Sequence, residues 1–242
     1  MDTKLYNKGL KDGIAVALGY FAVSFTFGMA AATKGISICQ AGLISLTNVT
    51  SAGQFSALAI IAAGGSYLEI ALTQLIINLR YCLMSFSLAQ KLEKDTKNYH
   101  RYLMAYSVTD EIFALDASQP GSLKPVYHYG ITCVAVPGWV LGTLLGAISG
   151  NVLPAYIISA MGVAIYGMFM AIIIPPARDN KAVLYVVISA MLVSSIFAYT
   201  PVLKRVSSGF VIIITTVLVA GIAAFLKPIA DENEQTANTV SE

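Results

Sequence analysis

Long apolar stretches almost free of charge are the feature that most constrains this chain. A helix crossing a ~30 Å hydrocarbon layer needs about 20 apolar residues. Seven segments meet this length: 13–33, 39–63, 67–90, 127–149, 152–174, 182–203 and 206–226. Charged residues are 12% of the 242 and hydrophobic residues 57%, so the charged coat of a soluble enzyme, nucleic-acid binder or disordered scaffold is missing. We predict an all-α integral membrane protein with about seven transmembrane segments.

The charged residues gather outside these stretches. Three lysines precede the first segment, and five basic residues lie in 91–124. Both groups favour the cytoplasm under the positive-inside rule, yet seven simple spans would put them on opposite sides. A second segment that enters and returns as two half-helices would resolve this, and we expect a cytoplasmic N-terminus. The polar, acidic end at 227–242 is expected to be disordered.

An internal repeat suggests how the segments are grouped. A shift of 114 residues aligns 28–60 with 142–174 at nine identical positions. Two halves of three segments, about 13–90 and 127–203, followed by 206–226, are typical of secondary transporters with broken helices at the substrate site. We therefore expect one transport domain over 1–226, a 3+3 repeat, and breaks in the second and fifth segments.

Polar residues in the middle of the second segment mark its expected break. Residues 46–55 read Leu-Thr-Asn-Val-Thr-Ser-Ala-Gly-Gln-Phe. Irregular backbone is tolerated in lipid only where it is buried in protein or lines a cavity, and half-helix ends there can receive a carboxylate or an ammonium group. The alternative is close helix packing by small residues. The predicted substrate-binding residues are Asn48, Ser51, Gly53, Gln54, Phe55 and, in the third segment, Asn78.

Arg80 is a charge near the middle of the third segment. At ~1.5 Å per residue it lies close to the bilayer midplane, where arginine costs at least ~2.5–3.5 kcal/mol and needs a partner or water. The amphipathic stretch 99–117, expected as one partly buried helix, supplies Asp110 or Glu111 as that partner. The same acids suit the first turn of a helix capped by Ser107. The pair is either a switch that couples protonation to transport or a structural tie between helices.

Three motifs resemble the AzlC-type family in order and spacing, over nearly the whole chain up to residue 226. They are Gly53-Gln54-Phe55, Asn78-Leu79-Arg80 followed by Leu83-Met84-Ser85, and Thr109-Asp110-Glu111. Such proteins are large subunits of bacterial branched-chain amino acid permeases. The resemblance implies export of branched-chain amino acids, and in some members methionine, with a small AzlD-type membrane subunit and the proton-motive force. It also implies importance for Gln54, Asn78, Arg80, Asp110 and Glu111.

Two alternatives stay open: an amino-acid uptake permease, and a structural or regulatory membrane subunit that transports nothing. No sequence motif of intramembrane hydrolysis or ATP use is present. We therefore expect no enzyme activity, catalytic residue, metal or cofactor, and no nucleic-acid partner. His100 and His128 are expected in loops as ordinary interfacial side chains. The expected surroundings are the lipid bilayer of the bacterial cytoplasmic membrane, crossed several times.

Overall fold

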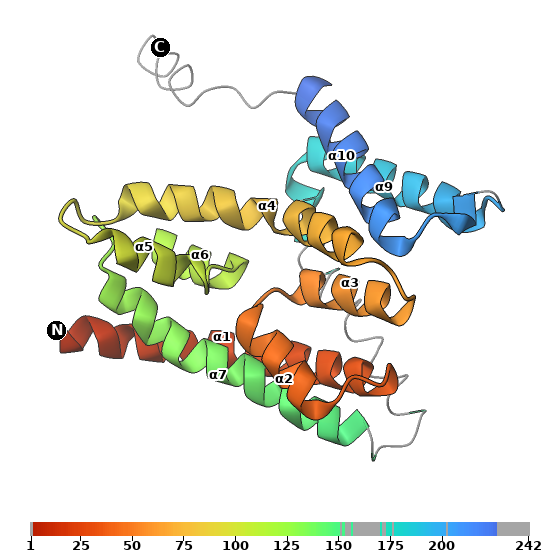
Figure 1. Ribbon diagram of the computed structural model, residues 1–242. Coiled ribbons are helices and arrows are strands. Elements are labelled where there is room, and N and C mark those ends of the chain that lie inside the picture. The colour runs from red at the N-terminus through yellow and green to blue at the C-terminus, as the bar shows by residue number, and fades with distance from the viewer. Residues whose placement is uncertain are drawn as a thin grey trace, which may run out of the picture. The chain divides into compact units, whose positions relative to one another are not determined.

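The computed structural model describes residues 2–150, 152, 156, 170, 173–175, 177–201 and 203–226. The chain divides into two compact units, Met1–Met168 and Phe169–Glu242, each described by itself. The first holds α1 (Thr3–Thr33), α2 (Ile38–Thr47), α3 (Ser51–Ala62), α4 (Tyr67–Lys91), α5 (Asn98–Ala105), α6 (Asp110–Ala117) and α7 (Pro125–Gly150) (Figure 1). The second holds α9 (Lys181–Tyr199), a 3₁₀ turn (Leu203–Arg205) and α10 (Ser208–Leu226).

Five described helices are long and apolar enough to cross a membrane: α1, α4, α7, α9 and α10. They correspond to the first, third, fourth, sixth and seventh expected segments, although α1 already begins at Thr3. The fifth segment, 152–174, lies mostly outside the described residues, and with it the second copy of the repeat. The seven-span count, the 3+3 repeat, a break in the fifth segment and a single domain over 1–226 therefore stay predictions.

Helices α1 and α7 form a close parallel pair along their whole length. Glycines of α7 meet successive turns of α1 in the same order: Gly130 beside Tyr6, Gly138 beside Ala17, and Gly146 beside Phe25. Small residues allow such backbone contact, which stabilises helix pairs in lipid, where apolar burial between helices adds little. This pair is the frame on which the broken helices pack.

The break expected in the second segment is present, and the segment is divided into α2 and α3 at residues 48–50. Thr50 Oγ1 donates a hydrogen bond of 2.9 Å to Asn78 Oδ1, and Gln74 Nε2 donates one of 2.8 Å to the Gly53 carbonyl. Because residue 50 meets 78 and residue 53 meets 74, α3 runs antiparallel to α4. Its first residue, Ser51, therefore lies beside the middle of α4, and α2 and α3 form a hairpin that turns back there (Figure 1).

The stretch 99–117 forms a second hairpin, so the expectation of one helix there is wrong. It is divided into α5 and α6 by a turn at 106–109. The N-cap of α6 is Thr109, whose Oγ1 accepts from the Ile112 amide at 3.4 Å, and the expected cap Ser107 lies within the turn. At the opposite end of α6, Lys91 Nζ donates to the Ala117 carbonyl. This hairpin therefore enters from the end where α4 finishes, opposite to the entry of the first hairpin.

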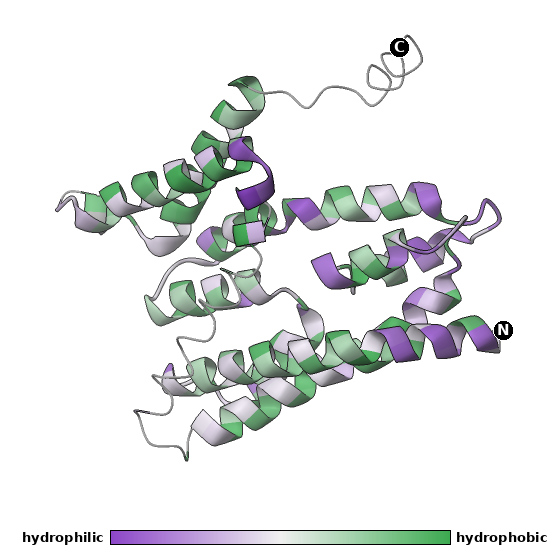
Figure 2. Cartoon of the chain, turned by 180° about the vertical axis from the view of Figure 1, so that it is seen from behind, coloured by the Kyte–Doolittle hydropathy of each residue, from purple (hydrophilic) through white to green (hydrophobic). Residues whose placement is uncertain are grey.

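The two basic segments lie at one end of this unit. Lys8 Nζ donates to Gln119 Oε1 at 2.7 Å, and Lys124 Nζ lies 3.8 Å from Asp2 Oδ2. Figure 2 shows hydrophilic residues at the start of α1 and at the end of α4. With the second segment re-entrant, the N-terminal lysines and the 91–124 loop can share the cytoplasmic side, as the positive-inside rule requires.

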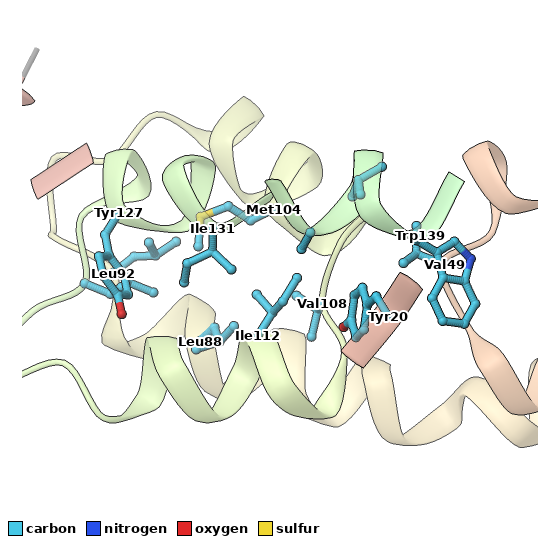
Figure 3. Packing of buried hydrophobic residues seen from close by; sticks show 13 residues of the cluster. Tyr20, Val49, Leu88, Leu92, Met104, Val108, Ile112, Tyr127, Ile131 and Trp139 are labelled. Carbon is cyan, nitrogen blue, oxygen red and sulfur yellow. The ribbon is translucent and has the colours of Figure 1, made fainter. Parts of the chain in front are cut away.

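The main hydrophobic core joins the hairpins to the long helices (Figure 3). Its buried members are Tyr20, Val49, Leu88, Leu92, Met104, Val108, Ile112, Leu123, Tyr127, Ile131, Ala135, Val136 and Trp139. Tyr20 of α1 and Trp139 of α7 pack edge to face, with ring centroids 5.3 Å apart. The apolar side chains of the hairpin turns, Val49 and Val108, are thus anchored where α1 and α7 are at mid-length.

Candidate functional site

A pocket of about 400 Å³ lies where the hairpin turns face α4. Its lining comes from residues 47–50, 78–86 and 105–108, namely Thr47, Asn48, Val49, Thr50, Asn78, Tyr81, Cys82, Ser85, Phe86, Ala105, Tyr106 and Val108. Asn78, Tyr81 and Ser85 share one face of α4, as their spacing at 100° per residue predicts. The volume and the mixture of apolar walls with a few polar groups are those of a small-molecule site.

Both hairpin turns carry the dipeptide Val-Thr just before a helix. The valines are buried, and the threonines, Thr50 and Thr109, are the N-caps of α3 and α6. Each threonine hydroxyl accepts from the backbone amide three residues on, at 3.4 Å. The turns also touch each other, because the Tyr106 hydroxyl donates to the Leu46 carbonyl. The positive ends of the α3 and α6 dipoles both lie beside the middle of α4, near Asn78 and Arg80.

Arg80 has Asp110 as its ionic partner. Its Nη1 lies 2.8 Å from Asp110 Oδ2, with the two side chains 41% and 32% exposed. Its Nη2 donates to the hydroxyl of Tyr81 at 3.0 Å. Tyr81 therefore contacts the ion pair and also lines the pocket.

Glu111, the other candidate partner, binds α1 instead. The Tyr20 hydroxyl donates to Glu111 Oε2 at 3.1 Å and is also hydrogen-bonded to the Thr109 hydroxyl. The two adjacent acids of α6 thus tie one helix start to two different long helices: Asp110 to α4, and Glu111 to α1.

Only two of the six residues predicted to bind substrate, Asn48 and Asn78, line the pocket. Gln54 is 1% exposed, with its Oε1 accepting from Trp139 Nε1 at 3.0 Å and its Nε2 donating to Ser45 Oγ at 2.8 Å. This network uses both ends of the amide and ties α2, α3 and α7 together. The other three have different surroundings: Gly53 faces Gln74, Phe55 packs edge-on against Phe27, and half-buried Ser51 opens α3.

His128 was expected in a loop but lies in α7 and is fully buried, so that expectation is wrong. Its Nδ1 is 2.6 Å from Asp116 Oδ2, and its Nε2 is 2.8 Å from Ser107 Oγ. All three side chains have no exposed surface. His100 is also helical, in α5, with its Nδ1 2.7 Å from the Tyr129 hydroxyl. The sequence carried no local signal for the buried group, because its members come from three elements that only the hairpin brings together.

Polar groups in the described part of the chain do not form a metal centre. No group of three or more His, Cys, Asp or Glu side chains there is placed to hold a metal ion. The three cysteines, Cys39, Cys82 and Cys133, are free and exposed, and only Cys82 lies in the pocket.

Comparison with known proteins identifies the family. The sequence model of the AzlC family, described as AzlC protein, matches residues 15–153, a shorter extent than the resemblance suggested but one that includes both hairpins and the ion pair. A membrane protein of Archaeoglobus fulgidus is 30% identical over 178 residues, 73% of this chain and 78% of that protein. The inner membrane protein YgaZ of Escherichia coli K12 is 27% identical over 184 residues, 73% and 75% of the two chains. No solved structure matches the chain. This protein is a membrane protein of the AzlC family.

Proposed function

We propose that this protein is a secondary transporter that exports branched-chain amino acids, and methionine as a further substrate, across the bacterial cytoplasmic membrane. The observation that carries the proposal is the pocket between two re-entrant hairpin turns with an ion pair beside it. Transporters place substrate where discontinuous helices meet at mid-depth, because helix ends there offer unpaired backbone groups. The Escherichia coli relative YgaZ is named an inner membrane protein, which supports the location.

The pocket offers complementary groups to a zwitterion with an aliphatic tail. The start of α3 at Ser51 provides backbone amides and a positive dipole end for the α-carboxylate. The side-chain amides of Asn48 and Asn78 provide oxygens for the α-ammonium group. Phe86 and Val108 give an apolar wall for the branched side chain. This assignment revises the expected set, in which Gln54 and Phe55 held the substrate.

The Arg80–Asp110 pair is the second part of the proposal. Protonation of Asp110 removes its negative charge and weakens the tie between the start of α6 and α4. Tyr81 connects this tie to the pocket, since it accepts from Arg80 and lines the substrate space. Bound substrate and a proton on Asp110 then both act on the α5–α6 hairpin. Coupled transport requires this, because each must stabilise one conformation of the hairpin more than the other. The small AzlD-type subunit completes the proposed transporter.

The proposal is tested in proteoliposomes loaded with labelled leucine, prepared with and without the small subunit. Gradient-dependent efflux supports export, whereas gradient-driven accumulation would identify an uptake permease. Absence of both efflux and counterflow in either preparation of folded protein would leave the non-transporting subunit as the function.

Cys82 gives a direct test of the pocket. In a chain with Cys39→Ser and Cys133→Ser, a water-soluble maleimide should modify Cys82. If leucine and the maleimide compete for the pocket, leucine should slow this modification about threefold or more. A matched chain that keeps only Cys133, which lies outside the pocket, should show no effect of leucine. Equal protection of both thiols, or of neither, would contradict binding at this pocket.

A further inference from the structure

The strongest unassigned feature is the buried chain Asp116–His128–Ser107, which joins the α5–α6 hairpin to α7. Asp116 Oδ2 meets His128 Nδ1 at 2.6 Å, and His128 Nε2 meets Ser107 Oγ at 2.8 Å. The second carboxylate oxygen, Asp116 Oδ1, is buried and has no hydrogen-bond partner in the described part of the chain. A polar group sealed in this way needs a reason, because desolvating a carboxylate is costly.

The serine allows the imidazole to be satisfied in either protonation state. In the neutral state, His128 donates from Nδ1 to Asp116, and its Nε2 accepts from the Ser107 hydroxyl. In the protonated state both ring nitrogens donate, and the Ser107 hydroxyl turns to another acceptor. Two acceptors are in place: Thr132 Oγ1 at 3.0 Å and the Met104 carbonyl at 3.4 Å. Rotation of one hydroxyl therefore accommodates a proton without leaving a ring nitrogen unpaired.

Proton binding also changes the net charge of the group. With neutral His128 the group carries the single negative charge of Asp116; with protonated His128 it carries none. The charged side chains around it are engaged with other partners: Lys91 with the Ala117 carbonyl, Lys8 with Gln119 and the Tyr127 ring, and Asp12 with the Tyr127 hydroxyl. On α5, His100 binds Tyr129. Among the described residues, the imidazole is therefore the one side chain that forms a hydrogen bond with this carboxylate.

We propose that Ser107, His128 and Asp116 form a proton-binding site through which the α5–α6 hairpin responds to the proton gradient. This inference rests on the proposed function for its role in transport, and on the geometry alone for proton binding. The site ties the end of α6 to α7, and the start of the same short helix carries Asp110, the partner of Arg80. A proton taken up at one end of α6 thus acts on the element whose other end follows Val108, which lines the pocket.

The same three residue types form the catalytic triad of serine hydrolases. Here the serine hydroxyl has no exposed surface, so no acyl substrate can reach it. Modification of Ser107 by a fluorophosphonate probe would overturn the proton-site assignment and favour a nucleophile.

Proton binding can be measured without any transport. The chain has two histidines, so isotope-labelled histidine gives two NMR signals, and His128→Gln assigns them. We expect the His128 signal to change protonation state within the pH range over which the protein stays folded, and Asp116→Asn to displace this change. His100→Gln is the matched control and should leave it in place. A His128 signal fixed in one state across this range would overturn the inference, whatever the protein transports.

Coupling is measured in proteoliposomes. In Asp116→Asn, which keeps the side-chain shape, gradient-driven leucine efflux should fall about tenfold or more while counterflow stays within about twofold of wild type. Ser107→Ala should shift the pH dependence of efflux, and His100→Gln should change neither assay. Equal loss of efflux and counterflow in folded Asp116→Asn protein would show a structural role and overturn the inference. Failure of the wild type to move leucine would refute the proposed function, while the histidine titration would still decide the proton site.

Discussion

A methyl group added at Gly146 tests the parallel packing of α1 and α7. A Cβ atom there would lie 1.9 Å from the Phe25 carbonyl oxygen and 2.7 Å from the Phe25 carbonyl carbon. The shorter distance is roughly 1.5 Å inside ordinary van der Waals contact. Because both neighbours are backbone atoms, no side-chain rotation relieves the clash, and the two helices must move apart.

The expected cost of Gly146→Ala follows from that separation. Overpacking a well-packed interface costs typically about 1–3 kcal/mol of stability. We also expect it to loosen the hydrogen bond between Ser45 of α2 and Thr143 of α7, because Thr143 lies close to Gly146 in the same helix. Gly19→Ala is the matched control, since this exposed glycine of α1 has no atom within 4 Å of an added Cβ. Alanine there should raise stability by about 0.5–1 kcal/mol, because glycine is the weaker helix former.

The chain provides its own probe for this measurement. Trp139 is its single tryptophan, and it is buried beside Tyr20 in the middle of α7. Its fluorescence during unfolding by sodium dodecyl sulfate should report the free energy of unfolding of both variants. Equal stability of Gly146→Ala and Gly19→Ala would refute the register described for α1 and α7, and destabilisation by Gly19→Ala alone would refute it more strongly.

Three further outcomes are expected. Gln54→Leu should lower the free energy of unfolding by about 1–3 kcal/mol, since it leaves the Trp139 N–H buried without an acceptor. It should leave the KM for leucine unchanged, and a raised KM with normal stability would return Gln54 to the substrate site. Asn78→Ala should raise that KM about tenfold, or ~1.4 kcal/mol, and an unchanged KM would place the substrate elsewhere. A double-mutant cycle of Arg80→Ala and Asp110→Asn should show a coupling free energy of no more than about 1 kcal/mol in stability, because both side chains are about a third or more exposed. The same variants should lose most gradient-driven efflux, and intact efflux in both single variants would rule out the coupling role.

The helices and the break in the second segment could be predicted because they follow from local chemistry. Apolar length determines α4, α7, α9 and α10 to within a few residues, apart from the end of α9. The polar run at 46–55 indicated the break at 48–50, since such a run cannot continue as a lipid-facing helix. The charge conflict between the N-terminal lysines and the 91–124 loop indicated the re-entrant path. Each of these arguments needs no knowledge of which helices are neighbours.

Which side chains contact each other could not be predicted. These contacts depend on which helices are neighbours and on how each helix is rotated about its axis, and the sequence determines neither directly. Asp110 and Glu111 are adjacent, so residue type and spacing make either a partner for Arg80. The parallel α1–α7 pair places Tyr20 beside α6, and this contact takes Glu111 and leaves Asp110 for α4. Gln54 was assigned to substrate because its side chain is too polar for helix packing alone; in the structure its amide is hydrogen-bonded to Trp139 and Ser45.

The two Val-Thr turns show how this chain accommodates irregular backbone beside the middle of its long helices. A threonine cap satisfies an amide at the start of each half-helix, and the preceding valine fixes the turn in the apolar core. One hairpin enters from each end of the unit, and both turns lie beside the middle of α4. Their contacts with α4 are the hydrogen bond of Thr50 with Asn78 and the ion pair of Asp110 with Arg80. In the proposed transporter, motion of either hairpin would strain these contacts beside the pocket, so that bound substrate and protonation of Asp110 would both change the free energy of that motion.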